Sequence, residues 1–211
     1  MNRFGKFALL VLAFASILSL ASRAGVQAKS TNQKSTNQDS ADQDSPKHDD
    51  AMAAAAIEEL VPVLRNPRCM NCHSSGDYPR QGDDMHPHIM AVRRGPDGHG
   101  LNAVKCSTCH QDHNLQGIHR PPGAPDWGLP PPSMPMIWEG LSDRQLCELL
   151  KDPQQNGHRS VQQIVEHMHA PLVLWAWNPG EGRKPIPESE SLFLNAVERW
   201  AFHGAACPLD K

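Results

Sequence analysis

The chain has 211 residues, of which 39% are hydrophobic and 20% charged, and its formal net charge is −3. This acidic balance excludes a protein that binds nucleic acid through a basic surface, and it provides no attraction to an anionic membrane. Nineteen prolines and fifteen glycines indicate a fold with many turns and loops. Six cysteines make the redox compartment the first question to settle.

Residues 1–28 have the features of a secretory signal peptide. Arg3 and Lys6 precede an unbroken apolar and small-residue run over 7–20, and small residues stand before a cleavage site after Ala28. The apolar run is too short for a comfortable bilayer span, so a retained membrane anchor is the weaker alternative. We therefore expect an exported, periplasmic protein with no stable membrane span after cleavage.

Residues 29–50 are predicted to be a disordered linker. Lys-Ser-Thr-Asn-Gln occurs twice in succession over 29–38, and no large apolar residue is present that could contribute to a core. Cleavage after Ala28 would leave 17 Lys and Arg against 23 Asp and Glu, a net charge of −6, because the leader holds three basic residues and no acidic one. Such a chain favours a redox partner protein with a basic patch.

Residues 51–211 have the length of a single domain. Their helices are predicted at 51–64, 143–151, 161–169 and 188–203. Asp50 is expected to cap the first helix, and Pro62 to kink or shorten its end. Ser142 and Ser160 each begin a Ser-x-x-Gln capping box.

Two long segments, 74–105 and 121–135, are rich in Gly and Pro and are predicted to be ordered loops. No segment alternates strongly enough between apolar and polar residues to predict a strand. The fold class is therefore mainly α with long ordered Pro/Gly-rich loops.

Two Cys-x-x-Cys-His sequences are the strongest signal: Cys69–His73, the first motif, and Cys106–His110, the second motif. Two thiols at this spacing reach the two vinyl groups of one porphyrin, while the adjacent imidazole reaches the iron. The attaching thiols would be Cys69, Cys72, Cys106 and Cys109, and the proximal iron ligands would be His73 and His110. Zinc binding and a thioredoxin-like redox pair are the alternatives, and both fit two complete motifs behind a signal peptide poorly.

The two motifs predict two covalently attached haem c groups within one domain. Cys106 follows Cys69 by 37 positions, too few for two consecutive single-haem domains. We expect a compact dihaem cytochrome c domain in which the haems lie close together, form part of the core and exchange electrons. Cys147 and Cys207 remain, and in an oxidising compartment they are predicted to form a disulfide, with a free reactive thiol as the alternative.

The sixth iron ligands are predicted from reach along the chain. For the first haem, His86 and His88 follow the motif by a loop long enough to cross the porphyrin, and we rank His88 ahead of His86. For the second, Met136 ranks first and His167 second, with a core position as the alternative for Met136. Other residues with sufficient reach are Met134, His119, His158 and His169.

Several stretches resemble a family of small bacterial dihaem cytochromes often named isoquinoline 1-oxidoreductase subunits. The similar stretches, spread over 57–208, are Arg68–His73, Gln81–Asp84, His86–His88, Arg94–Gly98, Pro121–Pro125, Leu150–Pro153, Trp177–Gly180 and Gly204–Pro208. The resemblance implies an electron acceptor for a periplasmic molybdenum hydroxylase-type dehydrogenase. The chain itself has too few cysteines left for an iron–sulfur cluster.

Electron transfer is thus the leading prediction: the protein would accept electrons from a dehydrogenase and pass them to a respiratory acceptor such as a cytochrome or an oxidase. In this role it is an electron carrier or an electron-transfer subunit rather than an enzyme in itself. The alternatives are a dihaem enzyme of peroxidase type with one open iron, and a haem-based sensor of redox state or of a gas.

Overall fold

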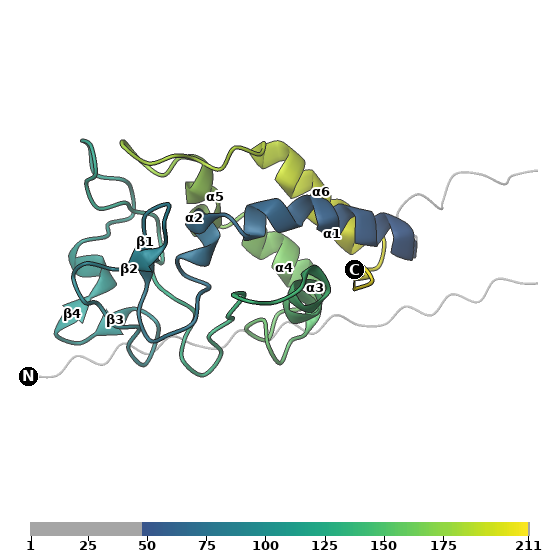
Figure 1. The fold of residues 1–211 in the computed structure, drawn as a ribbon, viewed down its shortest axis with the longest axis horizontal. Coiled ribbons are helices and arrows are strands. Elements are labelled where there is room, and N and C mark those ends of the chain that lie inside the picture. Colours follow the sequence, from purple (N-terminus) through teal and green to yellow (C-terminus); the bar gives the residue numbers. More distant parts are fainter. Residues whose placement is uncertain (1–47, 211) are drawn as a thin grey trace, which may run out of the picture. The chain divides into compact units, whose positions relative to one another are not determined.

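The computed structural model describes residues 48–210, so the predicted signal peptide and nearly all of the predicted linker lie outside the described residues. The elements in chain order are α1 (Asp50–Leu64), α2 (Pro67–Met70), β1 (Arg80–Gln81), β2 (His86–Pro87), β3 (Gly100–Leu101), β4 (Val104–Lys105), η1 (Cys106–Thr108), α3 (Asp143–Lys151), α4 (Val161–Met168), α5 (Pro171–Leu174), η2 (Trp175–Trp177) and α6 (Glu190–Phe202). Helices dominate this part of the chain, in agreement with the predicted mainly α class (Figure 1). Within residues 48–210, no helix combines the length and apolar character needed to cross a membrane.

Helix α1 begins one residue earlier than predicted. Asp49, rather than Asp50, is the N-cap, and its carboxylate accepts a hydrogen bond from the Met52 amide at 3.1 Å. The helix ends at Leu64, as predicted, and Pro62 lies inside it without shortening it further. A proline in the last turn removes a single amide donor from the helix, and Pro62 itself is exposed.

The two predicted capping boxes are present at α3 and α4. The Ser142 hydroxyl accepts from the Gln145 amide at 3.2 Å, and the Gln145 side chain accepts from the Ser142 amide at 2.8 Å. Ser160 and Gln163 repeat the exchange at 3.2 and 2.9 Å. Both helices therefore begin where the sequence predicts, because a capping box is encoded by residues three positions apart.

Four two-residue strands form two small antiparallel hairpins, which the sequence analysis did not predict. The paired residues are Arg80 with Pro87 and Gln81 with His86 in β1–β2, and Gly100 with Lys105 and Leu101 with Val104 in β3–β4. Strands this short have no periodic pattern to detect, so local hydropathy could not reveal them.

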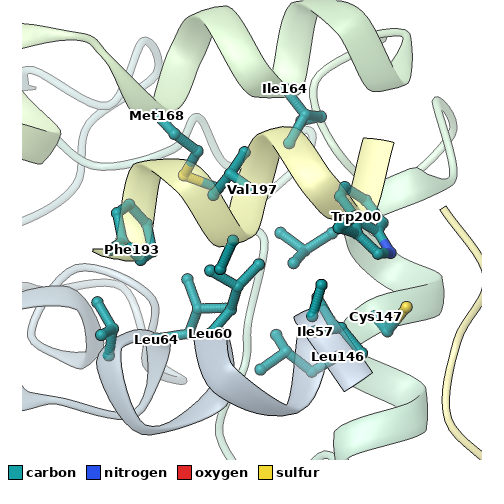
Figure 2. Packing of buried hydrophobic residues seen from close by; sticks show 14 of the residues in the cluster. Ile57, Leu60, Leu64, Leu146, Cys147, Ile164, Met168, Phe193, Val197 and Trp200 are labelled. Carbon is teal, nitrogen blue, oxygen red and sulfur yellow. The ribbon is translucent and has the colours of Figure 1, made fainter. Parts of the chain in front are cut away.

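The hydrophobic core lies among the helices, with α1 and α6 side by side (Figure 1). Figure 2 shows Ile57 and Leu60 of α1 directed toward Val197 and Trp200 of α6, with Ile164 of α4 against the same cluster. Ile57 and Trp200 are completely buried. Burying each such side chain stabilises the fold by roughly 1.5–3 kcal/mol, so this cluster supplies most of the apolar stabilisation of the described residues.

Cys147 of α3 and Cys207, which follows α6, form a disulfide with their Cα atoms 5.7 Å apart. This is the pairing predicted from the sequence. It holds the C-terminal segment against the helical core, since Cys147 is itself completely buried in the cluster.

Residues 74–135, hereafter the loop region, have almost no hydrophobic core. Their buried hydrophobic side chains are Ala124 and Leu129, whereas Ile89, Met90 and Ile118 are between 67% and 75% exposed. In Figure 1 this stretch winds through β1–β4 without a helix longer than one turn. A chain segment of this length normally needs apolar burial to offset the entropy of folding, so something else must hold it in place.

Candidate functional site

The first motif lies on a single helical turn that continues from α2. Asn66 caps this helix through its side chain, and Pro67 occupies its first turn. The Cys72 and His73 amides each donate to the Cys69 carbonyl at 3.1 Å. This turn presents both thiols and the imidazole from one short stretch of backbone.

The second motif has the same local geometry on the short helix η1. The amides of Cys109 and His110 both donate to the Cys106 carbonyl, at 3.2 and 2.9 Å. The β3–β4 hairpin leads directly into this turn, and the Cys106 amide donates to the His99 carbonyl at 3.0 Å. Two sequence motifs 37 positions apart therefore fold into two equivalent turns.

Both motif histidines have one ring nitrogen bonded to a backbone carbonyl. Nδ1 of His73 lies 3.0 Å from the Met136 oxygen, and Nδ1 of His110 lies 2.7 Å from the Pro122 oxygen. A carbonyl accepts only, so Nδ1 carries the proton and Nε2 keeps its lone pair. Metal-ligating histidines typically have this arrangement, because the second hydrogen bond fixes the tautomer and the ring orientation.

A tryptophan is stacked on each of these imidazoles. Trp138 lies parallel to His73 with ring centroids 3.6 Å apart and an interplanar angle of 4°. Trp127 lies parallel to His110 at 4.5 Å and 6°, and Trp175 meets Trp127 edge-on at 4.9 Å. The stacking prevents rotation of the imidazoles and leaves Nε2 pointing along a defined direction.

Both supports come from one Pro-rich segment, residues 121–138, which supplies the two carbonyls and the two stacked tryptophans. Most of this segment is predicted from the sequence as a loop, with Met134 and Met136 as candidate iron ligands but with no supporting role for its carbonyls or tryptophans. A backbone carbonyl has no signature in the sequence. The only available signal was the presence of two tryptophans, Trp127 and Trp138, in and just beyond a segment dominated by proline and glycine.

Burial disfavours the thiolate form of both cysteines of the first motif. Burial, together with the nearby Cys72, raises the pKa of Cys69 to about 12. Burial and then Cys106 raise the pKa of Cys72 to about 11, although Arg94 acts in the opposite direction. A thioredoxin-like pair needs a thiol of lowered pKa, so these values disfavour that alternative. The interaction between Cys72 and Cys106 also means that the two motifs lie close together.

Both motif histidines are held in the neutral form. Burial lowers the pKa of His73 to about 4, against the opposing effect of its hydrogen bond to the Met136 carbonyl. Burial also lowers the pKa of His110. A neutral imidazole with a free Nε2 is the form in which histidine ligates a metal.

The structure places His88 beside the second motif. Its ring centroid lies 6.3 Å from that of His110, with the two planes at 67°. The sequence analysis assigned His88 to the first haem because it follows the first motif along the chain. His86 makes a different contact, since its Nδ1 lies 2.7 Å from the Asp84 carboxylate.

Met136 contributes its backbone to the first motif, and its side chain packs against the hydrophobic cluster. This arrangement matches the alternative of a core methionine and does not favour Met136 as a ligand at the second motif. His167 lies on the last turn of α4, and its charge contributes to lowering the pKa of His73. Of the other candidates, the Met134 sulfur accepts from the Gly157 amide at 2.5 Å, and His169 lies 3.6 Å from the Glu198 carboxylate.

Several buried polar groups around the first motif fit a cofactor with carboxylate groups such as haem. The Trp138 indole N–H, the Ser74 hydroxyl and the Arg80 Nε are buried without a hydrogen-bond partner among the described residues. Arg94 is only 2% exposed, and its guanidinium donates to the Gly76 and Pro130 carbonyls at 3.0 and 2.5 Å rather than to a carboxylate. Unsatisfied buried donors are costly, and a bound group with acceptor oxygens would satisfy them.

Within residues 48–210, no group of three or more His, Cys, Asp or Glu side chains could hold a metal ion in the way that a structural zinc site requires. Comparisons with protein-family models, with curated proteins and with solved structures found no match to the chain.

Proposed function

We propose that the protein is a periplasmic dihaem c-type cytochrome that transfers electrons. The observation that supports this most strongly is the repetition of one constellation at two places. Each Cys-x-x-Cys-His turn has an imidazole whose Nδ1 is bonded to a carbonyl and whose ring is stacked on a tryptophan. Two chance occurrences of the motif would not be expected to acquire the same support from the same Pro-rich segment.

The proposal gives each motif residue a definite task. Each of the four thiols adds across one vinyl group, with sulfur bonding to one carbon and the proton passing to the other, so no leaving group or oxidant is needed. The protonated state of Cys69 and Cys72 agrees with this addition. His73 and His110 hold the iron through Nε2. When bound, haem supplies a one-electron couple of iron.

Fixed ligands favour electron transfer over catalysis at these sites. Stacking and hydrogen bonding restrain both motif histidines, so the coordination shell can remain unchanged between oxidation states. The two motifs also lie close enough for Cys72 and Cys106 to interact electrostatically. Two redox centres at such a separation would exchange electrons within the protein.

The resemblance to dihaem cytochromes supports a molybdenum hydroxylase-type dehydrogenase as electron donor and a cytochrome or an oxidase as acceptor. The net charge of −6 that cleavage of the leader would leave favours a partner with a basic docking surface. A rate of electron transfer that falls as ionic strength rises would be the kinetic signature of such a pair.

The central test is to express the full chain in a host that matures c-type cytochromes and to analyse the secreted protein. Mass spectrometry of the intact protein is expected to give the mass of the processed chain plus two haems. A redox titration is expected to give two reversible waves, and the isolated protein is expected to refuse carbon monoxide and cyanide. A product without covalent haem would overturn the proposal, and rapid ligand binding by one haem would favour the peroxidase-type alternative.

The donor is tested separately by stopped-flow mixing with a purified, reduced molybdenum hydroxylase of the periplasm. We expect fast haem reduction that slows with added salt. A variant with lysine in place of several exposed acidic residues is the control for charge, and should react more slowly. If the reduced hydroxylase fails to reduce the wild-type protein, this pairing has to be abandoned, while the electron-transfer proposal stands on the previous test.

A further inference from the structure

We infer that the sixth ligands are crossed between the motifs: His88, from the loop that follows the first motif, ligates the iron held by the second. The inference rests on the proposed haem attachment and adds which histidine completes which site. It differs from the order suggested by the sequence, in which each haem would take its sixth ligand from the loop after its own motif.

The spacing of the His88 and His110 rings carries the argument. Two imidazoles on opposite sides of one metal ion, each with a metal–nitrogen bond of about 2 Å, have ring centres about 6 Å apart. The observed centroid separation is 6.3 Å. No hydrogen bond joins the two rings, since Nδ1 of His88 accepts from the Met90 amide and Nδ1 of His110 is bonded to the Pro122 carbonyl.

The β1–β2 hairpin fixes the position of His88 relative to the first motif. Arg68, next to Cys69, forms an ion pair with Asp83 in the turn of this hairpin. Asn71 of the first motif donates to the Gly82 carbonyl at 3.1 Å and accepts from the Arg80 amide at 2.8 Å.

His88 follows β2 directly, and its amide donates to the Pro79 carbonyl at 3.0 Å. The hairpin is therefore anchored on the first motif and presents His88 to the second. Arg68 is almost fully buried, so this anchor is part of the structure rather than a surface contact.

One contact must change when His88 binds a metal. The Met90 amide donates to Nδ1 of His88 at 3.3 Å, whereas an imidazole that ligates through Nε2 carries its proton on Nδ1. The contact is long, and Ile89 and Met90 are both largely exposed, so residues 89–91 can turn without disturbing the core. The crossed ligation thus predicts a local rearrangement immediately after His88.

His167 is then the candidate that remains for the first motif. It lies on the last turn of α4 and is partly buried. Helix α4 is held in the core by Ile164 and Met168 (Figure 2), so the position of His167 is set by the helical part of the molecule. Each site would then have two histidine ligands, and neither iron would be open.

The test uses His88→Ala, with His86→Ala as the matched control on the same hairpin. His88→Ala should convert one haem from six- to five-coordinate, as seen by optical and paramagnetic-resonance spectra. This haem should then bind one equivalent of carbon monoxide, and added imidazole should restore the original spectrum. His86→Ala should leave both haems unchanged, because His86 is bonded to Asp84.

The stacked tryptophans identify which haem has changed. Trp127→Phe should shift the paramagnetic-resonance signal of the second haem alone, and Trp138→Phe that of the first. His88→Ala is expected to convert the signal that Trp127→Phe shifts. Conversion of the other signal, or no conversion at all, would overturn the crossed ligation.

The single-haem variants Cys69→Ala/Cys72→Ala and Cys106→Ala/Cys109→Ala provide a second route to the same answer. Adding His88→Ala should leave the iron five-coordinate in Cys69→Ala/Cys72→Ala, which keeps the second motif, and should have no such effect in Cys106→Ala/Cys109→Ala. These outcomes can be told apart from failure of the proposed function. A protein with two covalent haems in which His88 does not ligate the second iron would reject only the crossed ligation. A chain without covalent haem would reject the crossed ligation and the proposed function together.

Discussion

The helical part of the molecule and the loop region are held together by different forces. Helices α1, α3, α4 and α6 share a cluster of buried side chains, among them the fully buried Ile57 and Trp200. The loop region buries two hydrophobic side chains and relies on hydrogen bonds, ion pairs and tight turns. From this comparison we expect the helical part to fold by itself, and we expect the loop region to depend on the haems proposed for the two motifs.

Close backbone approaches in the loop region illustrate how it is built. Gly98, at φ +87°, lies so close to Leu129 that an added Cβ would be 2.0 Å from the Leu129 oxygen. The Leu129 amide donates to the Gly98 carbonyl at 2.9 Å across the same contact. Such contacts set the path of the chain but bury little apolar surface, so they cannot replace a core.

The largest expected effect follows from removing the second attachment site. In Cys106→Ala/Cys109→Ala, we expect the amides of the loop region to lose nearly all protection from hydrogen exchange, while α1 and α6 keep most of theirs. The reason is that attachment of the proposed haem would be coupled to folding of the loop region. Ser107→Ala/Thr108→Ala is the control, since it alters the same turn and keeps the motif. Equal loss of protection in the helices would contradict the proposed division.

Removing the disulfide tests the stability of the helical part independently of the loop region. Cys147 and Cys207 are 60 positions apart, so removing the crosslink should lower the free energy of unfolding by roughly 2–4 kcal/mol. We expect Cys147→Ala/Cys207→Ala to reduce the thermal stability of the helices while the haem spectra remain unchanged. Calorimetry together with optical spectra measures both. A spectral change as large as that of a ligand variant would show that the two parts are not separable.

Local signals account for what the sequence predicted correctly. The capping boxes at Ser142 and Ser160 are each encoded within four residues, so they can be recognised without knowledge of the fold. The N-cap of α1 was displaced by one residue because Asp49 and Asp50 are chemically equivalent, and the backbone conformation decides between them.

Long-range contacts account for what was missed. The carbonyl that fixes His73 belongs to Met136, 63 positions away, and any residue type can supply a carbonyl. His88 was assigned to the nearer motif because chain order was the only guide, yet the β1–β2 hairpin directs it to the second. The sequence thus specifies the residues of the two motifs, whereas the folded chain determines which groups lie beside them.

Arg94 offers a smaller effect inside the loop region. Arg94→Met would leave the Gly76 and Pro130 carbonyls without their buried donor, which should cost about 2–4 kcal/mol of loop stability. The loss of a positive charge near Cys72 and His73 should also lower the reduction potential of the first haem. Arg94→Lys keeps the positive charge but cannot make the same pair of hydrogen bonds. We therefore expect it to preserve the reduction potential of the proposed first haem while still lowering the stability of the loop region. Redox titration and hydrogen exchange separate the two effects, and an unchanged potential in Arg94→Met would show that Arg94 is only structural.

The smallest effect concerns Glu139, which follows Trp138 in the chain and accepts hydrogen bonds from Ser75 at the start of the loop region. Hydrogen bonds from the Ser75 hydroxyl and amide hold the pKa of Glu139 below its ordinary value, helped by Arg80. A carboxyl group with a lowered pKa stabilises the fold above its unfolded-state pKa, and the effect disappears as the pH falls through its folded-state value.

Glu139→Gln should therefore be less stable than wild type at pH 7 by under about 1 kcal/mol, since the group is partly exposed. The difference should shrink as the pH falls below the ordinary pKa of a glutamate and through the lowered pKa of Glu139, as measured by denaturant unfolding at pH 7 and at a series of lower pH values. Glu166→Gln, on the exposed face of α4, controls for the loss of one charge and should show no such dependence in the loop region. If the Glu139→Gln difference persisted undiminished at low pH, the link between loop and tryptophan would owe little to the ionised carboxylate, and packing of Trp138 on His73 would have to hold that end of the loop region instead.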